Sequence, residues 1–183
     1  MDFQQLILQR QSVRKFDKER PIEREKLMRI LEAGRLAPSA SNSQPWTFVV
    51  ADEPGLVLQI SKAMGITKLH SFNKFAINAR LHIALVIEKP KLITQIGASL
   101  QKIDYPLIDI GIAAGHMCLQ AAEDGIGSCM VGWFDEKKIK ELLDIPKNKT
   151  IGLMIPFGYP VADYPLRKKI RKPLDKIVRW NKY

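Results

Sequence analysis

Residues 109–143 have the sequence DIGIAAGHMCLQAAEDGIGSCMVGWFDEKKIKELL, and this stretch constrains the fold more than any other. Its first part, Asp109–Glu123, is apolar on nearly every helical face, which predicts a buried helix rather than a surface one. Small residues in that helix would let a second backbone approach closely, either inside the domain or across a subunit interface. These residues are Gly111, Ala113, Ala114 and Gly115. A strand is expected within residues 128–133, and Asp135 should cap a helix that extends to Leu143.

The flanking segments alternate between helical and extended patterns. Helices are predicted after Asp2, which can cap the first of them, from Pro21 up to Pro38, and from Pro54 through Met64. Short β-rich runs predict strands over residues 46–51, 82–88 and 151–158. Strands separated by helices favour a mixed sheet covered by helices over a β-sandwich. The stretch 65–80 is irregular and polar, and it is interpreted as a lid or a connection.

Charge is concentrated at the two ends of the chain. The 183 residues carry a formal net charge of +10, yet residues 31–163 are neutral and residues 164–183 hold eight basic residues against one acidic residue. The length predicts one domain over residues 1–183 with a basic tail over 164–183. Because no nucleic-acid recognition motif accompanies the charge, an anion held by the two ends together, such as a small phosphate, is as good a candidate as a polymer.

Several other classes of protein are disfavoured. The first residues lack the pattern of a secretory signal, and the uncharged run 110–122 is too short to span a bilayer, so we expect a cytoplasmic protein without membrane association. Gly125 and Gly127 follow a helix and precede a strand, the reverse of a dinucleotide fingerprint. Neither GxSxG nor HExxH occurs. His116, Cys118 and Cys129 are better explained as a helix histidine and core thiols than as metal ligands, so no metal site is expected.

Three polar segments are candidates for ligand binding. Arg10, Ser12 and Arg14 alternate after the first helix, and guanidinium groups with a hydroxyl suit phosphate oxygens. The run PSASNSQPW (38–46) offers donors and acceptors that suit the edge of a heteroaromatic ring, and RKKIRKP (167–173) places Lys169 and Arg171 at alternate positions. The alternatives are a solvated basic turn, a polar connection and an exposed charge run.

Taken together and in this order, these segments resemble the FMN-dependent nitroreductase family. The resemblance extends over RQSVRKFD, LEAGRLAPSASNSQPWTFVV, the 109–143 stretch, IPFGYP and the tail RKKIRKPLDKIV. It implies an α+β fold with a central mixed sheet of four to five strands flanked by helices. It also implies an intertwined homodimer with two FMN sites at the subunit interface, each drawing on both chains, and NADH or NADPH as the electron donor.

The resemblance also implies roles for individual residues. Arg10, Ser12 and Arg14 would hold the FMN phosphate together with Lys169 and Arg171. Pro38, Ser39 and Ala40 would lie along the flavin, and Asn42 and Gln44 would contact its ribityl chain and ring edge. Backbone amides near Val131 and Gly132 would face N5 and O4, and Asn73, with Lys74 as a further candidate, would contact the pyrimidine side. The chain departs from the family pattern where Ala40 replaces a common Ser and Arg80 replaces a common Pro.

The implied reaction is a ping-pong transfer of hydride from NAD(P)H to a small acceptor such as a nitroaromatic or a quinone, with the chemistry on flavin N5 and no catalytic side chain. Two alternatives stay open. One is a family member that reduces an enone or a carbon–halogen bond. The other is a non-enzymatic basic protein that binds nucleic acid or an anionic membrane.

Overall fold

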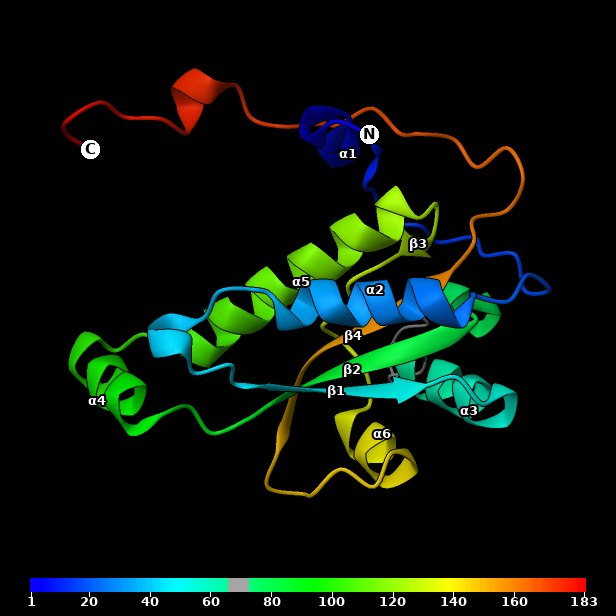
Figure 1. Ribbon diagram of the computed structural model, residues 1–183, viewed down its shortest axis with the longest axis horizontal. Helices are drawn as coiled ribbons and strands as arrows, with labels where there is room; N and C mark the ends of the chain where they lie inside the picture. The colour runs from blue at the N-terminus through cyan, green and yellow to red at the C-terminus, as the bar shows by residue number, and fades with distance from the viewer. Residues whose placement is uncertain (66–72) are drawn as a thin grey trace.

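The computed structural model describes residues 1–65 and 73–183 (Figure 1). The α-helices are α1 (Phe3–Gln9), α2 (Arg24–Arg35), α3 (Pro54–Gly65), α4 (Leu92–Gln101), α5 (Tyr105–Glu123) and α6 (Glu136–Leu142). The strands are β1 (Trp46–Ala51), β2 (Leu81–Ile87), β3 (Gly127–Ser128) and β4 (Thr150–Gly158). Short 3-10 helices are η1 (Ala40–Asn42), η2 (Lys74–Asn78) and η3 (Leu174–Lys176).

The four strands form one sheet in the order β1-β2-β4-β3, and the α+β class is confirmed. All three pairings among these strands are antiparallel, and the one parallel pairing found among the described residues is an isolated bridge between Ser12 and Ser128. The connection from β1 to β2 explains their antiparallel pairing. It leaves the sheet at Ala51 and returns at His82, which is the register partner of Ala51, so the helix between them does not cross to the opposite end of the sheet.

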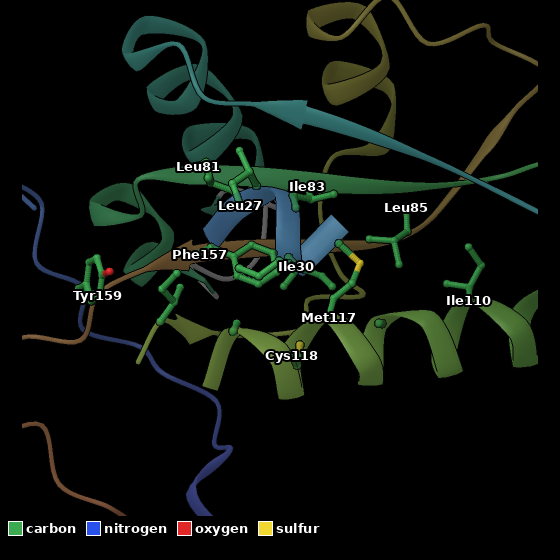
Figure 2. Packing of buried hydrophobic residues seen from close by; sticks show 14 residues of the cluster. Leu27, Ile30, Leu81, Ile83, Leu85, Ile110, Met117, Cys118, Phe157 and Tyr159 are labelled. Carbon is green, nitrogen blue, oxygen red and sulfur yellow. The ribbon is translucent and has the colours of Figure 1, made fainter. Parts of the chain in front are cut away.

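The sheet separates two hydrophobic cores because strand side chains alternate between its faces. On β2, Leu81, Ile83 and Leu85 face the core that α2 and α5 cover, and Ala84 and Val86 face the core that α3 and α6 cover. Figure 1 shows these two helix pairs on opposite sides of the sheet, and Figure 2 shows the α2 and α5 side. The central strand β2 is therefore buried on both faces.

Helix α5 is the buried helix predicted from the sequence, and its small residues divide into two groups. Ala113 and Ala114 are fully buried inside the chain. A Cβ added at Gly111 or Gly115 would meet no atom of the chain within 4 Å, so that stripe of the helix is open. At the crossing with α2, a Cβ on Gly34 would lie 2.8 Å from the side chain of Met117, so a glycine is needed at this close approach.

Two elements differ from the sequence prediction. Helix α4 was not predicted, because its segment LITQIGASLQ contains β-branched residues and a glycine, which have low helix propensity. The strand expected within residues 128–133 is shorter and begins earlier, and beyond Ser128 only an isolated bridge joins Val131 to Met154. Pro156 of β4 lies opposite Cys129 and has no N–H to donate, which interrupts the pairing between them.

The basic tail leaves β4 and extends past α1, away from the sheet (Figure 1). Its apolar side chains are exposed, among them Ile170, Leu174 and Trp180. Of the stretch interpreted as a lid or connection, residues 66–72 lie outside the described residues, and the described part from Asn73 onward contains η2. No helix among the described residues is long and apolar enough to cross a membrane.

Candidate functional site

The segment after α1 is docked on β3. Ser12 forms a parallel bridge with that strand, and the Val13 N–H donates to a β3 carbonyl at 2.9 Å. Val13 is buried, and a Cβ on Gly127 would lie 2.8 Å from its side chain, so a glycine is needed at this close approach. With Val13 directed inward, the alternation of an extended chain places Arg10, Ser12 and Arg14 on the opposite side, as the sequence predicted.

The tail brings further cations to the same place. Lys169 Nζ donates to the carbonyl of Arg10, and the guanidinium of Arg167 donates to the carbonyl of Ser12. A hollow of about 280 Å³ results, lined by residues 10–12, Arg14 and residues 167–171. We refer to the ligand-binding candidates around this hollow as the basic cluster. Its members are Arg10, Ser12, Arg14, Arg167, Lys169 and Arg171.

The basic cluster has an excess of positive charge. Burial, together with repulsion from Arg10, Arg171 and Arg167, holds the pKa of Lys169 below its ordinary value. Among the described residues that line the hollow there is no Asp or Glu. A bound anion would relieve the repulsion, and guanidinium groups beside a hydroxyl match the oxygens of a phosphate.

A second group of candidates lies beside the cluster. Val131 exchanges two backbone hydrogen bonds with Met154, at 2.9 and 3.0 Å, which fixes the chain just before Gly132. Asn73 precedes η2 with a left-handed backbone (φ 63°), and its side-chain amide donates to the carbonyl of Trp133 at 2.9 Å. Asn73 therefore ties the start of η2 to the segment that contains Val131 and Gly132.

This second group is continuous with the basic cluster. The thiol of Cys129 interacts with the side chains of Ser12 and Arg14, and burial raises its pKa. The guanidinium of Arg14 lies 5.9 Å from the centre of the Phe75 ring in η2. One chain thus brings together the cluster, Asn73 and the Val131–Gly132 backbone.

The third group, which we call the polar loop, comprises residues 38–44. Ser41, Asn42 and Gln44 all have positive φ angles, of 51°, 49° and 49°. Inside the loop, the Gln44 N–H donates to Ser39 Oγ at 2.9 Å, and the Gln44 side-chain amide donates to Asn42 Oδ1 at 2.9 Å. The loop is therefore a defined structure and not an irregular polar connection.

One chain does not bring the polar loop to the basic cluster. Ala40 hydrogen-bonds to Asp109 near the start of α5, whereas Ala122 near the end of α5 shares a hollow with Arg10. At 1.5 Å per residue, these two points of the helix are about 20 Å apart. Figure 1 shows the same separation, with η1 beside α4 at one end of α5 and β3 at the other.

The thiols and the histidine considered as metal ligands have other surroundings. Cys118 is part of the hydrophobic core, and burial raises its pKa to about 11. His116 lies on the wall of a groove of about 930 Å³ between α2, β1 and α5, where Trp46 and Phe48 stack with their ring centroids 6.1 Å apart. Within residues 1–65 and 73–183, no three His, Cys, Asp or Glu side chains form a group that could hold a metal ion.

A comparison with models of protein families matches residues 7–159 to the nitroreductase family. The chain belongs to that family. The match begins before Arg10 and includes the polar loop, all four strands and the Val131–Gly132 segment, so the resemblance inferred from the sequence is confirmed. Residues 1–6 and residues 160–183, which supply Arg167, Lys169 and Arg171, lie outside it.

Named proteins support the assignment of this nitroreductase-family chain to the oxidoreductases. It is 30% identical to an oxygen-insensitive NADPH nitroreductase of Helicobacter acinonychis, over 96% of this chain and 95% of the relative. A solved FMN-dependent nitroreductase of Clostridium difficile is 30% identical, with a TM-score of 0.75 over 97% of this chain and 98% of that one. An iodotyrosine deiodinase of Thermotoga neapolitana is 28% identical, over 97% of each chain.

Sequence reasoning about this nitroreductase-family chain missed three residues that contact the candidate groups. Arg167 belongs to the basic cluster, and its spacing of two residues before Lys169 was a signal that could have identified it. Asp109 and Thr94 contact the polar loop from α5 and α4. They lie 69 and 54 residues from Ala40 in sequence, and no local pattern connects them.

Proposed function

We propose that this chain is an FMN-dependent oxidoreductase that takes a hydride from NADH or NADPH and reduces a small acceptor such as a nitroaromatic or a quinone. The basic cluster carries the proposal, because it joins five cations from both ends of the chain around a hollow lined by no acidic residue among those described. The Helicobacter relative is named as an NADPH nitroreductase and the Clostridium structure as an FMN-dependent nitroreductase, and both names support the same function.

The residues present fit FMN. Its phosphate carries close to two negative charges at neutral pH, which suits a cluster in which burial and neighbouring cations lower the pKa of Lys169. In this proposal Arg10, Ser12 and Arg14 hold the phosphate with Lys169 and Arg171, and Arg167 joins them.

The ring would lie against the second group. Asn73, with Lys74 as a further candidate, would contact its pyrimidine side, and backbone N–H groups near Val131 and Gly132 would face its N5 and O4 edge. Bound FMN would supply the hydride chemistry in a ping-pong order, first with the nicotinamide and then with the acceptor. The protein would position both substrates and stabilise the negative charge that develops on the ring, without a catalytic side chain.

The site needs a second copy of the chain, because the polar loop lies about 20 Å from the cluster along α5. In the proposed homodimer, the loop residues Pro38, Ser39, Ala40, Asn42 and Gln44 of one protomer complete the site that the cluster of the other begins. The open stripe at Gly111 and Gly115 and the exposed apolar tail provide surfaces for such a partner. The single domain and the cytoplasmic location stay predictions.

The function is tested by loading the purified protein with FMN and mixing it anaerobically with NADH or NADPH. We expect bleaching of the flavin absorbance by at least one nucleotide and its return on addition of a nitroaromatic or a quinone. In the Arg14→Ala variant we expect weaker FMN binding and a nearly unchanged unfolding midpoint of the apoprotein. Failure of both nucleotides to bleach the flavin, or tight DNA binding without FMN uptake, would contradict the proposal.

Sharing of the site between protomers is tested with mixed dimers. One protomer carries Arg14→Ala and the other carries Gln44→Ala, so the shared arrangement leaves one site intact and puts both changes in the other. We expect about half of the sites to retain wild-type FMN affinity. If no site retained wild-type affinity, with one weakened by each change, each chain would instead build its own site.

A second acceptor class is favoured by the deiodinase relative, whose match extends over almost the whole chain. A halophenol therefore belongs in the acceptor panel beside the nitroaromatic, the quinone and an enone. Halide release coupled to flavin reoxidation would assign the chain to carbon–halogen reduction.

A further inference from the structure

The polar loop holds backbone conformations that ordinary side chains avoid. Three of its residues, Ser41, Asn42 and Gln44, have left-handed φ angles, and none of them is glycine. Such conformations persist only where surrounding groups hold them, and they concentrate at ligand-binding sites. Side chains from α5 and α4 form hydrogen bonds with the backbone of this loop.

One residue of the loop, Ala40, is held through both its backbone N–H and its backbone carbonyl. The Ala40 N–H donates to both carboxylate oxygens of Asp109 on α5, at 3.1 and 3.2 Å. The Ala40 carbonyl accepts from Thr94 Oγ1 on α4, at 3.3 Å. Asp109 and Thr94 are each only 3% exposed, so water competes little for either contact.

The Thr94 contact is the end of a directed chain of hydrogen bonds. The Lys91 N–H donates to Ser43 Oγ at 3.3 Å, and Ser43 Oγ lies 2.7 Å from Thr94 Oγ1. Since Thr94 gives its one hydroxyl proton to Ala40, Ser43 must donate to Thr94. The start of α4 is thereby coupled to both ends of η1.

Asp109 is a costly residue to bury for stability alone. Among the described residues, its carboxylate has the Ala40 N–H as its one donor outside the helix, and burial raises the pKa of this carboxyl. A buried carboxylate with so few donors is generally less favourable than an apolar side chain of similar size. Its clearest structural consequence is the orientation of the Ala40 peptide.

We propose that Asp109 and Thr94 are positioning residues that hold the backbone of Ala40 on both sides of its Cα, so that Asn42 and Gln44 are pre-arranged for the flavin. The inference rests on the proposed function, in which the loop of one protomer contacts the FMN of the other. The contacts to Ala40 orient the loop backbone, and the hydrogen bond from the Gln44 amide to Asn42 Oδ1 then fixes these two side chains relative to each other.

The test uses titration of apoprotein with FMN, followed by flavin fluorescence and visible circular dichroism, alongside urea unfolding of the same apoproteins. For Asp109→Ala we expect the Kd for FMN to rise about tenfold, with an altered dichroism of the bound ring. Asp109→Asn keeps an acceptor for the Ala40 N–H and should restore the Kd to within about threefold of wild type. Thr94→Ala should give a smaller rise than Asp109→Ala, and Thr94→Ser should match wild type.

The matched control is Asp104→Ala, at the N-terminus of the same helix. Asp104 caps α5 by accepting from the Leu107 N–H at 3.4 Å, and it does not contact the polar loop. This variant should lower the unfolding midpoint and leave the FMN Kd within about twofold. Equal Kd values for Asp104→Ala and Asp109→Ala, or no rescue by Asp109→Asn and Thr94→Ser, would overturn the positioning role alone. A wild-type protein that binds no FMN, or an Arg14→Ala variant that binds it normally, would overturn the proposed function as well.

Discussion

The basic cluster and the polar loop are built in opposite ways. The cluster is formed by long, charged side chains from the two ends of the chain, and burial together with their repulsion lowers the pKa of Lys169. The loop consists of short neutral side chains held by hydrogen bonds in conformations that are strained without them. In the proposed site, the cluster would therefore gain its affinity from charge that a ligand must neutralise, and the loop would contribute a shape that exists before the ligand binds.

The two regions also rest on different buried groups. Beneath η2, on the cluster side, Ser61 Oγ donates to the Ala76 carbonyl at 2.8 Å and lies 2.7 Å from His82 Nε2. His82 Nε2 must then carry the proton, and Nδ1 is buried without a partner among the described residues. The loop side rests instead on the carboxylate of Asp109. The two supports titrate with opposite effects on stability.

The largest expected effect is loss of stability through His82 in mild acid. Burial lowers the pKa of His82 from 6.5 to about 4. At a pH between these two values, His82 is protonated in the unfolded chain and neutral in the folded chain. The free energy of unfolding should fall by about 3 kcal/mol as the pH drops through this window. Urea unfolding between about pH 7 and about pH 4.5 should show the slope in the wild type and its loss in His82→Gln.

Asp109→Asn provides the contrast. Because burial raises the pKa of the Asp109 carboxyl, its ionisation penalises the folded state at higher pH, and acidification relieves that penalty. Its replacement should leave the His82 slope in place. A slope that persists in His82→Gln would assign the acid sensitivity to other groups.

An intermediate effect is expected from Lys169→Met, which keeps most of the aliphatic stem and removes the charge. Loss of one charge-assisted contact should raise the Kd for FMN about 30-fold, or about 2 kcal/mol, and reduce its dependence on salt. The stability of the apoprotein should change little, because the lost hydrogen bond to Arg10 is offset by relief of repulsion.

Lys172→Met is the matched control for that variant, since Lys172 belongs to the same tail and does not line the hollow. Its Kd should stay within about twofold of wild type, because an exposed charge outside the cluster contributes little. Equal losses in the two variants would show that the tail acts only through its total charge.

The contrast between the regions also explains what could be predicted from the sequence. Arg10, Ser12 and Arg14 occupy alternate positions in a segment that is extended against β3. Their spacing in the sequence therefore directly predicts that their side chains lie on one side. The buried helix around Ala113 was equally visible, since a helix that is apolar on all faces is stable only when it is buried. The direction of β2 was not visible, because it depends on where the connection from Ala51 returns.

The loop shows why the rest could not be predicted. Its composition marked it as polar and turn-forming, but nothing local specifies left-handed backbone at Ser41 and Gln44. The loop is instead joined to Asp109 through the Ala40 N–H, and the position of Asp109 at the start of an apolar helix gave no sign of a partner 69 residues away. Sequence patterns describe charge and periodicity well, whereas contacts between distant residues appear only in the folded chain.

The smallest expected effect is that of Ser39→Ala, which tests whether the loop exists before the ligand binds. The change removes the acceptor of the Gln44 N–H and should lower stability by about 1 kcal/mol or less, because the exposed donor can bond to water instead. If the loop is preformed, FMN affinity should fall only two- to threefold while amide hydrogen exchange at Gln44 accelerates in the apoprotein. If exchange in the wild type is already fast and slows only when FMN binds, the loop is ordered by the ligand, and the contrast with the basic cluster fails at that point.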